Sequence, residues 1–472
     1  MNRGCTDGYD RGVIGRARRW ASSLTRFGRE NQESLHALHD RVGELRHEAG
    51  ELRRENGELR HLIEEVRREN RRAGDTLDLV SRRLALRAPV VRVVFLVHNV
   101  NTFSSYEPVY RLMADDPSFA PLVLSMANRL ARPDALLDEE VNHRGLEERG
   151  IPHLRLTATD PWDDLLALKA LQPDLILRQS QWDADYAPAF HSRELRFAPL
   201  AYVPYEILNI VQNIGSEHGP DTATESEFHR GAWRVFCTSD RVVEQLQVRG
   251  SVAGHRYEVT GHPRVDQLAA AEPDWPSAAP AGGRVLWSAH HSIDPDWTAF
   301  GTFLDDADRM VAWARERADL DFVFSPHPSL SARLRDQPEL AERGDSFERD
   351  WSALPNTRIL APGRDYVPVL AAADAVVTDG LSLLLEAQIA GRPVVFLERE
   401  GHRAFNDVGE RIVTGTHRVP DADAARAVVD ALLADGDPLA DIQRATVADL
   451  LPTRGAARRI VASISAGINA YS

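Results

Sequence analysis

The stretch VVTDGLSLLLEAQIAGRPVVF, residues 376–396, carries the pattern that decides the fold. An apolar, β-branched run ends at Asp379 and Gly380, a leucine-rich run follows it, and Gly391 precedes a second apolar run. Short continuous apolar runs are typical of strands covered on both faces, and the leucine-rich run has the length of a helix. The stretch therefore predicts one strand–helix–strand unit of a parallel sheet.

The same alternation continues along the chain in two series. The apolar runs lie at residues 90–97, 120–126, 173–179, 198–205, 233–239 and 257–261, and again at 284–289, 321–328, 357–362, 374–379 and 392–398. Helix-like segments separate the runs, so each series predicts a doubly wound α/β domain. We expect two Rossmann-like domains that face a cleft, with ligands at the carboxyl ends of the strands.

The domain boundaries follow from these series and from composition. Residues 89–271 are expected to form the N-terminal Rossmann-like domain, and residues 284–440 the C-terminal one. Residues 272–283 are rich in proline, alanine and glycine and are predicted to be a linker. Residues 441–472 are predicted to be helices that pack back across the domains.

Residues 28–88 carry a heptad repeat, which predicts a coiled coil. Position a holds Leu35, Val42, Ala49, Asn56, Ile63, Asn70, Leu77 and Leu84, and position d holds Leu38, Leu45, Leu52, Leu59, Val66, Ala73 and Val80. In a parallel pair, Glu48 would meet Arg53 of a second copy, and Glu55 would meet Arg60. We therefore predict a parallel homodimer; the alternative is a single long helix folded back on its own globule.

Residues 1–27 form a basic tail that we expect to be disordered. Four arginines, Arg11, Arg16, Arg18 and Arg19, lie beside apolar residues that include Trp20. The tail is either solvated or in peripheral contact with an anionic membrane surface.

Composition excludes several classes of protein. A net charge of −15 and a pI near 5.6 argue against a nucleic-acid protein held by bulk electrostatics. Only Cys5 and Cys237 are present, so we expect neither a disulfide framework nor a zinc site. We also expect no other metal and no cofactor. Without a spanning run or signal peptide, the protein is expected to be cytoplasmic, at the inner face of the plasma membrane if the tail binds lipid.

Histidines follow the predicted strands of both domains at their carboxyl ends. The segments VTGHPR, LWSAHHS and FVFSPHP contribute His262, His290, His291 and His327. Because the carboxyl ends of parallel strands gather at one edge, we expect these imidazoles to line a shared site, together with Arg264 and Ser292.

The strand–helix junction of residues 376–396 predicts an anion site. Backbone amides at a helix start attract phosphate, and glycine permits close approach. Thr378, Asp379, Gly380 and Ser382 are therefore expected to bind the phosphates of a nucleotide, and Glu386 its ribose hydroxyls. In the alternative interpretation Asp379 is only an N-cap and Glu386 a solvated helix residue.

These residues together resemble a known family, the CDP-glycerol glycerophosphotransferases of teichoic acid and capsule synthesis. The resemblance rests on YVPY, VTGHPRVD, SPHP, VVTDGLSLLLEA with GRPVVF, and RGAARRIVASI, over residues 91–465. It implies a GT-B-like fold with an N-terminal acceptor domain and a C-terminal nucleotide-donor domain. It also implies transfer of glycerol phosphate from a CDP-activated donor to an acceptor hydroxyl of an envelope glycan or polyol. His327 would be a functional histidine, and GHPR would line the cleft.

The sequence departs from the family at three places. The family's Trp-His-Gly-Thr-Pro run, with its base, is absent; YVPYEILNI stands there, so Glu206 or His218 is the predicted base. The Asp-Tyr-Ser-Ser run appears as residues 379–382 with one serine, and SAHHS replaces a Pro-Thr-Trp-Arg run. Two alternatives stay open: a GT-B glycosyltransferase that uses a UDP- or GDP-sugar, and a non-catalytic coiled-coil scaffold derived from a transferase.

Overall fold

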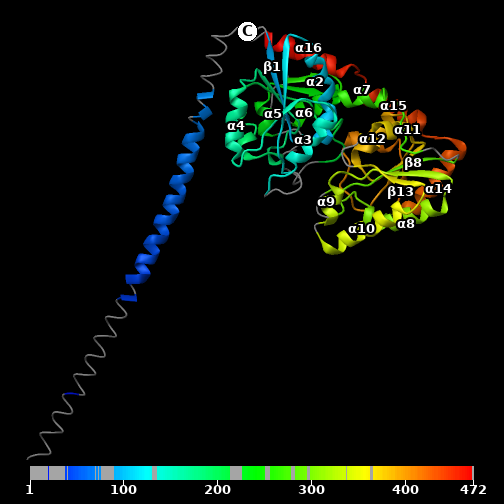
Figure 1. Ribbon diagram of the computed structural model, residues 1–472, viewed down its shortest axis with the longest axis horizontal. Helices are drawn as coiled ribbons and strands as arrows, with labels where there is room; N and C mark the ends of the chain where they lie inside the picture. Colours follow the sequence, from blue (N-terminus) through cyan, green and yellow to red (C-terminus); the bar gives the residue numbers. More distant parts are fainter. Residues whose placement is uncertain are drawn as a thin grey trace, which may run out of the picture. The chain divides into compact units, whose positions relative to one another are not determined.

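The computed structural model describes residues 20, 38–39, 41–69, 71–72, 74–75, 90–129, 135–212, 226–249, 256–277, 282–294, 298–335, 337–361 and 365–469 (Figure 1). The chain divides into two compact units, Met1–Asp75 and Thr76–Ser472. None of the helices within the described residues is long and apolar enough to span a membrane.

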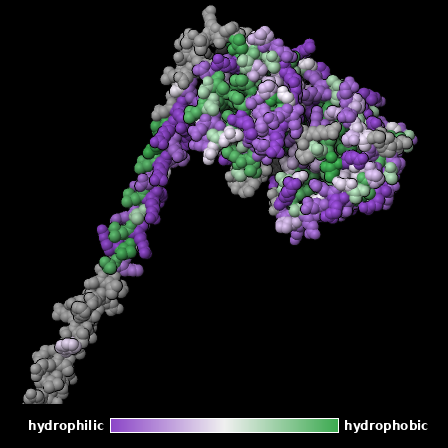
Figure 2. All heavy atoms as spheres, viewed as in Figure 1, coloured by the Kyte–Doolittle hydropathy of each residue, from purple (hydrophilic) through white to green (hydrophobic). Residues whose placement is uncertain are grey.

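The first unit contains a continuous helix over residues 41–69. Its heptad leucines lie in solvent within the single chain: Leu45, Leu52 and Leu59 are 50%, 59% and 56% exposed. Figure 2 shows hydrophobic residues beside hydrophilic ones along this helix. The predicted basic tail of residues 1–27 lies outside the described residues except for Trp20, as do residues 28–37 and 76–88 of the predicted coiled coil.

The second unit contains two parallel sheets. Within the described residues the first has the strand order β3-β2-β1-β4-β5-β6-β7 and the second β10-β9-β8-β11-β12-β13. The strands of the first sheet are β1 (Val91–Val97), β2 (Phe119–Ser125), β3 (His153–Arg155), β4 (Leu175–Arg178), β5 (Leu200–Tyr202), β6 (Arg234–Cys237) and β7 (Tyr257–Val259). Those of the second are β8 (Gly283–Ser288), β9 (Leu320–Phe324), β10 (Thr357–Ile359), β11 (Ala375–Thr378), β12 (Val394–Leu397) and β13 (His417–Val419).

Helices cover both sheets (Figure 1). The N-terminal half contributes η1 (Val100–Ser105), α2 (Glu107–Ala114), α3 (Glu139–Glu148), α4 (Pro161–Ala170), η2 (Asp183–Asp185), η3 (Pro188–Phe190), α5 (Glu227–Gly231), α6 (Asp240–Arg249) and α7 (Pro263–Ala269). The C-terminal half contributes α8 (Phe303–Glu316), α9 (Leu330–Arg335), α10 (Pro338–Ser352), α11 (Val367–Ala372), α12 (Leu381–Ile389), α13 (Asp407–Val413), α14 (Ala422–Asp435), α15 (Ala440–Leu450) and α16 (Ala456–Asn469). The predicted α/β class with two Rossmann-like halves is confirmed.

The central strands form because their side chains are apolar on both faces. Val93 to Val97 of β1 and Val394 to Leu397 of β12 are at most 1% exposed. The sequence pattern missed β3 and β13, which are three-residue edge strands with polar residues. An edge strand is covered on fewer sides and needs no apolar run, so hydrophobicity does not mark it.

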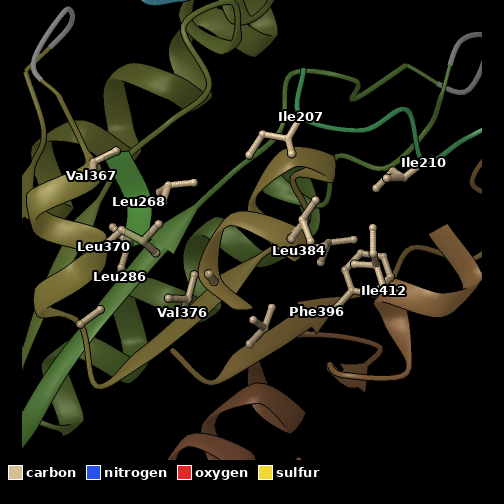
Figure 3. Packing of buried hydrophobic residues seen from close by; sticks show 14 of the residues in the cluster. Ile207, Ile210, Leu268, Leu286, Val367, Leu370, Val376, Leu384, Phe396 and Ile412 are labelled. Atoms are coloured by element: carbon tan, nitrogen blue, oxygen red, sulfur yellow. The ribbon is translucent and has the colours of Figure 1, made fainter. Parts of the chain in front are cut away.

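Two packing contacts tie the halves together. Ile460 and Ile464 of α16, late in the chain, are buried in the core of the first sheet. The loop after β5 reaches the second sheet, where Ile207 and Ile210 pack with Leu384 and Ile412 (Figure 3). This apolar junction positions the carboxyl end of β5 beside α12.

His98, directly after β1, is a buried neutral imidazole. It is 3% exposed, and its Nδ1 lies 3.1 Å from Oε1 of Gln179. Burial, assisted by the nearby Arg178 guanidinium, lowers the pKa of His98 to about 3. Since an unfolded histidine titrates near 6.5, the unfolded chain binds the extra proton between pH 3 and 6.5.

We therefore expect the free energy of unfolding to decrease as the pH falls below 6.5. For His98 alone the loss between pH 7 and pH 5 is about 2 kcal/mol. Urea denaturation at the two pH values measures it, with His98→Gln as the comparison. The variant should lose less stability than the wild type over this interval, and equal losses would contradict the assignment.

Candidate functional site

Three of the predicted histidines lie together at the carboxyl ends of β8 and β9. His290 and His291 follow β8, and His327 follows β9, its neighbour in the sheet. The ring centroids of His291 and His327 are 4.0 Å apart and the rings are stacked. The His290 ring is 4.4 Å from that of His291 and 5.3 Å from that of His327. The structure thus brings these three residues into one cluster, which we call the histidine cluster.

Hydrogen bonds fix which ring nitrogen carries the proton in two members of the histidine cluster. Nδ1 of His327 accepts the backbone N–H of Ser329 at 3.1 Å. Nδ1 of His290 lies 2.7 Å from the Ser292 hydroxyl and accepts the Ser292 N–H at 3.3 Å. The Ser292 hydroxyl in turn accepts the N–H of Phe300. A nitrogen that accepts an amide N–H cannot carry a proton, so in the neutral rings Nε2 is the donor.

The histidine cluster is uncharged near neutral pH. Burial lowers the pKa of His290 to about 3, with a contribution from His291. Burial and then the charge of Arg333 lower the pKa of His291 to about 4, and burial also lowers the pKa of His327 well below 6.5. His290 and His327 therefore offer neutral N–H donors, which suit an anion such as a phosphate.

The three rings of the histidine cluster are also close enough to hold a metal ion. One ring nitrogen of each histidine lies within 4.8 Å of the corresponding nitrogens of the other two, and imidazole nitrogens are common metal ligands. Binding through Nε2 of His290 or His327 would require the proton to move to Nδ1, which would break the hydrogen bonds to Ser292 and Ser329. The arrangement therefore favours an anion over a cation.

His262 uses the same capping contact for a different purpose. Its Nδ1 accepts the N–H of Arg264 at 3.1 Å, and its Nε2–H donates to the Pro204 carbonyl at 2.6 Å. The preceding Gly261 has φ +79°, and a Cβ there would lie 2.9 Å from the Thr453 carbonyl oxygen, so only glycine fits. His262 thus joins α7 to the loop after β5, whereas the other three histidines contact one another.

Asp379 lies behind the histidine cluster. It is fully buried, and its carboxylate accepts the N–H of His290 at 2.6 Å and the N–H of Thr302 at 2.6 Å. Burial raises the pKa of Asp379 to about 7, although the hydrogen bonds from these two N–H groups act to lower it. The N-cap of α12 is Gly380, and the Gly380 N–H is itself bound by the Thr378 hydroxyl. Asp379 is therefore not the N-cap, and its carboxylate holds the His290 loop in place.

Ser382 and Glu386 lie on α12 in different surroundings. Ser382 is exposed in the first turn. Glu386 is buried, accepts the Tyr366 hydroxyl, and has its Oε1 3.5 Å from Nε of Arg264. The Arg264 guanidinium also lies over the Tyr366 ring at 4.8 Å. Arg264 and Glu386, which were expected to bind a ligand separately, pair with each other across the two halves of the unit.

Of the two predicted bases, Glu206 lies within the described residues. Glu206 is half-buried in the loop after β5, next to Tyr205. His218 lies outside the described residues. The sequence interpretation missed Asp185, which follows β4 in the run SQWDADY. It lies in η2, seven residues after the end of β4, so the pattern that singled out the histidines, polar residues directly after a buried strand, does not mark it.

Solved structures of other proteins share this fold. MnaA of S. aureus, solved with UDP, is 15% identical with a TM-score of 0.55 over 80% of this chain and 97% of its own. The wall teichoic acid polymerase TagF is 13% identical with a TM-score of 0.54, over 85% and 98%. TagF soaked with CDPG is 12% identical with a TM-score of 0.53, over 84% and 97%.

These likenesses define the class of the fold. Neither a protein-family model nor a curated protein matches the chain. At these identities the comparison shows the fold, which is GT-B-like: two Rossmann-like domains in tandem. The GT-B-like fold that the sequence resemblance implied is confirmed.

Replacing Asp379 with alanine is expected to lower the free energy of unfolding by about 3 kcal/mol, because two buried amides lose their acceptor. Urea denaturation of the full chain measures the change. Ser382→Ala, a few residues away and exposed, is the control and should cost less than about 0.5 kcal/mol. Equal costs for the two variants would contradict the supporting role of Asp379.

Proposed function

We propose that the protein is a transferase that moves glycerol phosphate, or a similar alcohol phosphate, from a CDP-activated donor to an acceptor hydroxyl in cell-envelope polymer synthesis. The observation that carries the proposal is the pair of neutral donors at His290 and His327. Their Nε2–H groups are fixed by backbone amides at the carboxyl edge of the C-terminal sheet. Ligands of open α/β sheets bind at this edge.

The chemistry of the leaving group fits these donors. When the donor's phosphorus is transferred, CMP departs with increasing negative charge on its phosphate. Preorganised N–H donors stabilise such charge without reorganisation, and the Ser382 hydroxyl and the first amides of α12 can add to them. The neutral rings keep their donors over a wide pH range, because their pKa values lie well below neutrality.

The structural neighbours support a nucleotide donor and leave two nucleotides to compare. TagF was soaked with CDPG and MnaA was solved with UDP, each on the same fold. A GT-B glycosyltransferase with a UDP- or GDP-sugar is thus the second candidate, and a non-catalytic scaffold is the third. The residue that would bind a ribose in any of the enzymes, Glu386, is paired with Arg264. Ribose binding there would require this pair to separate.

Thermal unfolding with CDP, UDP and GDP tests the donor class. We expect CDP at about 100 times its Kd to stabilise the fold by about 3 kcal/mol, and UDP and GDP to do less. A larger shift with UDP or GDP would favour the glycosyltransferase, and no shift with any of them would favour the scaffold.

His327→Ala is expected to slow CMP release from CDP-glycerol by about 100-fold, since one preorganised donor is lost. His143→Ala serves as the control, because His143 belongs to a separate histidine pair with His153 on α3 and β3. Turnover of His327→Ala equal to that of His143→Ala would contradict the role of the histidine cluster.

We also propose that the heptad helix pairs with a second copy of this chain. The helix of residues 41–69 exposes its leucine stripe, and Gly43, Gly50 and Gly57 recur in it every seven residues. Each glycine in a helix interior costs about 1 kcal/mol, so a lone helix of this sequence is marginal and gains from a partner. The interchain pairs Glu48–Arg53 and Glu55–Arg60 give the complementary charge for a parallel dimer.

Light scattering of the full chain should give twice the chain mass. Leu52→Asp, at a d position, is expected to yield the monomer, because it places a charge in the apolar seam. Arg54→Asp, on the outer face of the same turn, should leave the dimer intact. A wild-type monomer, or a monomer from both variants, would contradict this pairing.

A further inference from the structure

Two aspartates on one turn after β4 have opposite surroundings. Asp183 has its carboxylate fully engaged: Oδ1 accepts from Nη1 of Arg178 at 2.6 Å and from the N–H of Ser192 at 2.9 Å, and Oδ2 accepts the Ser192 hydroxyl at 2.8 Å. Arg178 is fully buried. Burial acts to raise the pKa of Asp183, but the positive charge of Arg178 outweighs this effect and the pKa is lowered. Asp183 thus holds a buried cation and is ionised near neutral pH.

Asp185, two residues later, has a different environment. Its Oδ2 accepts the Ser180 hydroxyl, and its backbone carbonyl accepts the N–H of Arg129 at 3.0 Å. Burial raises the pKa of Asp185, and the negative charge of Asp183 raises it further. The Ser180 hydroxyl and the charge of Arg178 act to lower this pKa but do not outweigh burial. Pairs of carboxylates whose environments separate their pKa values are the arrangement that enzymes use to divide structural and proton-transfer roles.

Two aromatic side chains accompany Asp185. Trp182, on the same turn, and Tyr205, on the loop after the neighbouring strand β5, have ring centroids 6.0 Å apart at an angle of 59°. Burial, then the charges of Glu206 and Asp185, raise the pKa of Tyr205. Aromatic faces contact the C–H surfaces of a polyol or saccharide, while a carboxylate accepts its hydroxyl protons.

A chain of contacts connects this turn to the donor side. The loop that carries Tyr205 is bound through the Pro204 carbonyl to His262. His262 caps α7, whose Arg264 pairs with Glu386 of α12. The loop that carries Tyr205 is therefore connected to α12, the helix of the second half whose first turn carries Ser382.

We propose that Asp185 is the general base of the transfer reaction, in a subsite for a polyol or saccharide acceptor bounded by Trp182 and Tyr205. This inference rests on the proposed transferase function. The acceptor hydroxyl gives its proton to the Asp185 carboxylate as its oxygen forms a bond to the donor's transferred phosphorus. The bond from that phosphorus to the bridging oxygen breaks, and its electron pair leaves on CMP.

Asp185→Asn in the full chain tests the assignment, with CDP-glycerol as donor and glycerol as the acceptor probe. We expect kcat for CMP release to fall at least about 100-fold, because the amide cannot take the proton. The thermal shift with CDP should be unchanged, which also verifies that the variant folds. Asp185→Glu, which restores a carboxylate, should recover part of the rate.

The pH profile separates proton transfer from a structural role. In the wild type, kcat should decrease toward acid pH as Asp185 becomes protonated, and in Asp185→Asn this acid limb should be lost. The titratable and charged groups around Asp185 are Arg178 and Asp183 on its own segment, Tyr205 on the loop after β5, and Arg129, whose backbone contacts it. A retained acid limb in Asp185→Asn would overturn the proposal.

Asp183→Asn is the matched control, since it makes the same change two residues away. It should lower the unfolding temperature by weakening the contact with Arg178, while turnover per folded molecule stays within about twofold of wild type. Wild-type turnover in Asp185→Asn, or an equal loss in Asp183→Asn, would overturn the assignment of the base.

Wild-type protein that binds CDP but releases CMP no faster with glycerol would overturn the acceptor class. A wild type that binds none of CDP, UDP and GDP would instead overturn the proposed function itself.

Discussion

One contact recurs at the ends of three strands and the candidate site depends on it. In His262, His290 and His327, Nδ1 accepts the backbone N–H of the residue two positions later. Each imidazole thereby satisfies a backbone amide where the ladder stops, and its proton is confined to Nε2. The same contact is found at His262, where Nε2–H donates to a carbonyl, and at His290 and His327, whose Nε2–H groups are the donors that we propose bind a phosphate.

Buried carboxyl groups support these donors. Asp379 takes the amides of His290 and Thr302, which fixes the loop after β8 to β11. Such a carboxylate is tolerated in the core because its hydrogen bonds replace those to water. The Arg264–Glu386 pair plays the corresponding part between the two halves, beside the apolar contacts of Ile207 and Ile210. Both arrangements join segments of the candidate site that are far apart in sequence.

In the N-terminal half, two neighbouring carboxylates have different hydrogen-bond partners. Asp183 neutralises the buried Arg178, and Asp185 keeps a weaker partner in Ser180. This difference arises from a few hydrogen bonds on one turn and not from residue type. It is the basis on which we propose a general base for a chain without the Trp-His-Gly-Thr-Pro run.

The sequence by itself determined the features that depend on local periodicity: the apolar strands of both sheets, the helix α12, and the heptad helix. It also placed His290, His291 and His327 at one edge, because parallel strands bring their carboxyl ends together. Only the tertiary structure decided that Glu386 pairs with Arg264, that Asp379 is a buried support, and that Asp185 differs from Asp183. The edge strands β3 and β13 were also settled only there. The reason is physical: a side chain's role depends on partners that are distant in sequence, and their registers and burial are set by packing and not by local pattern.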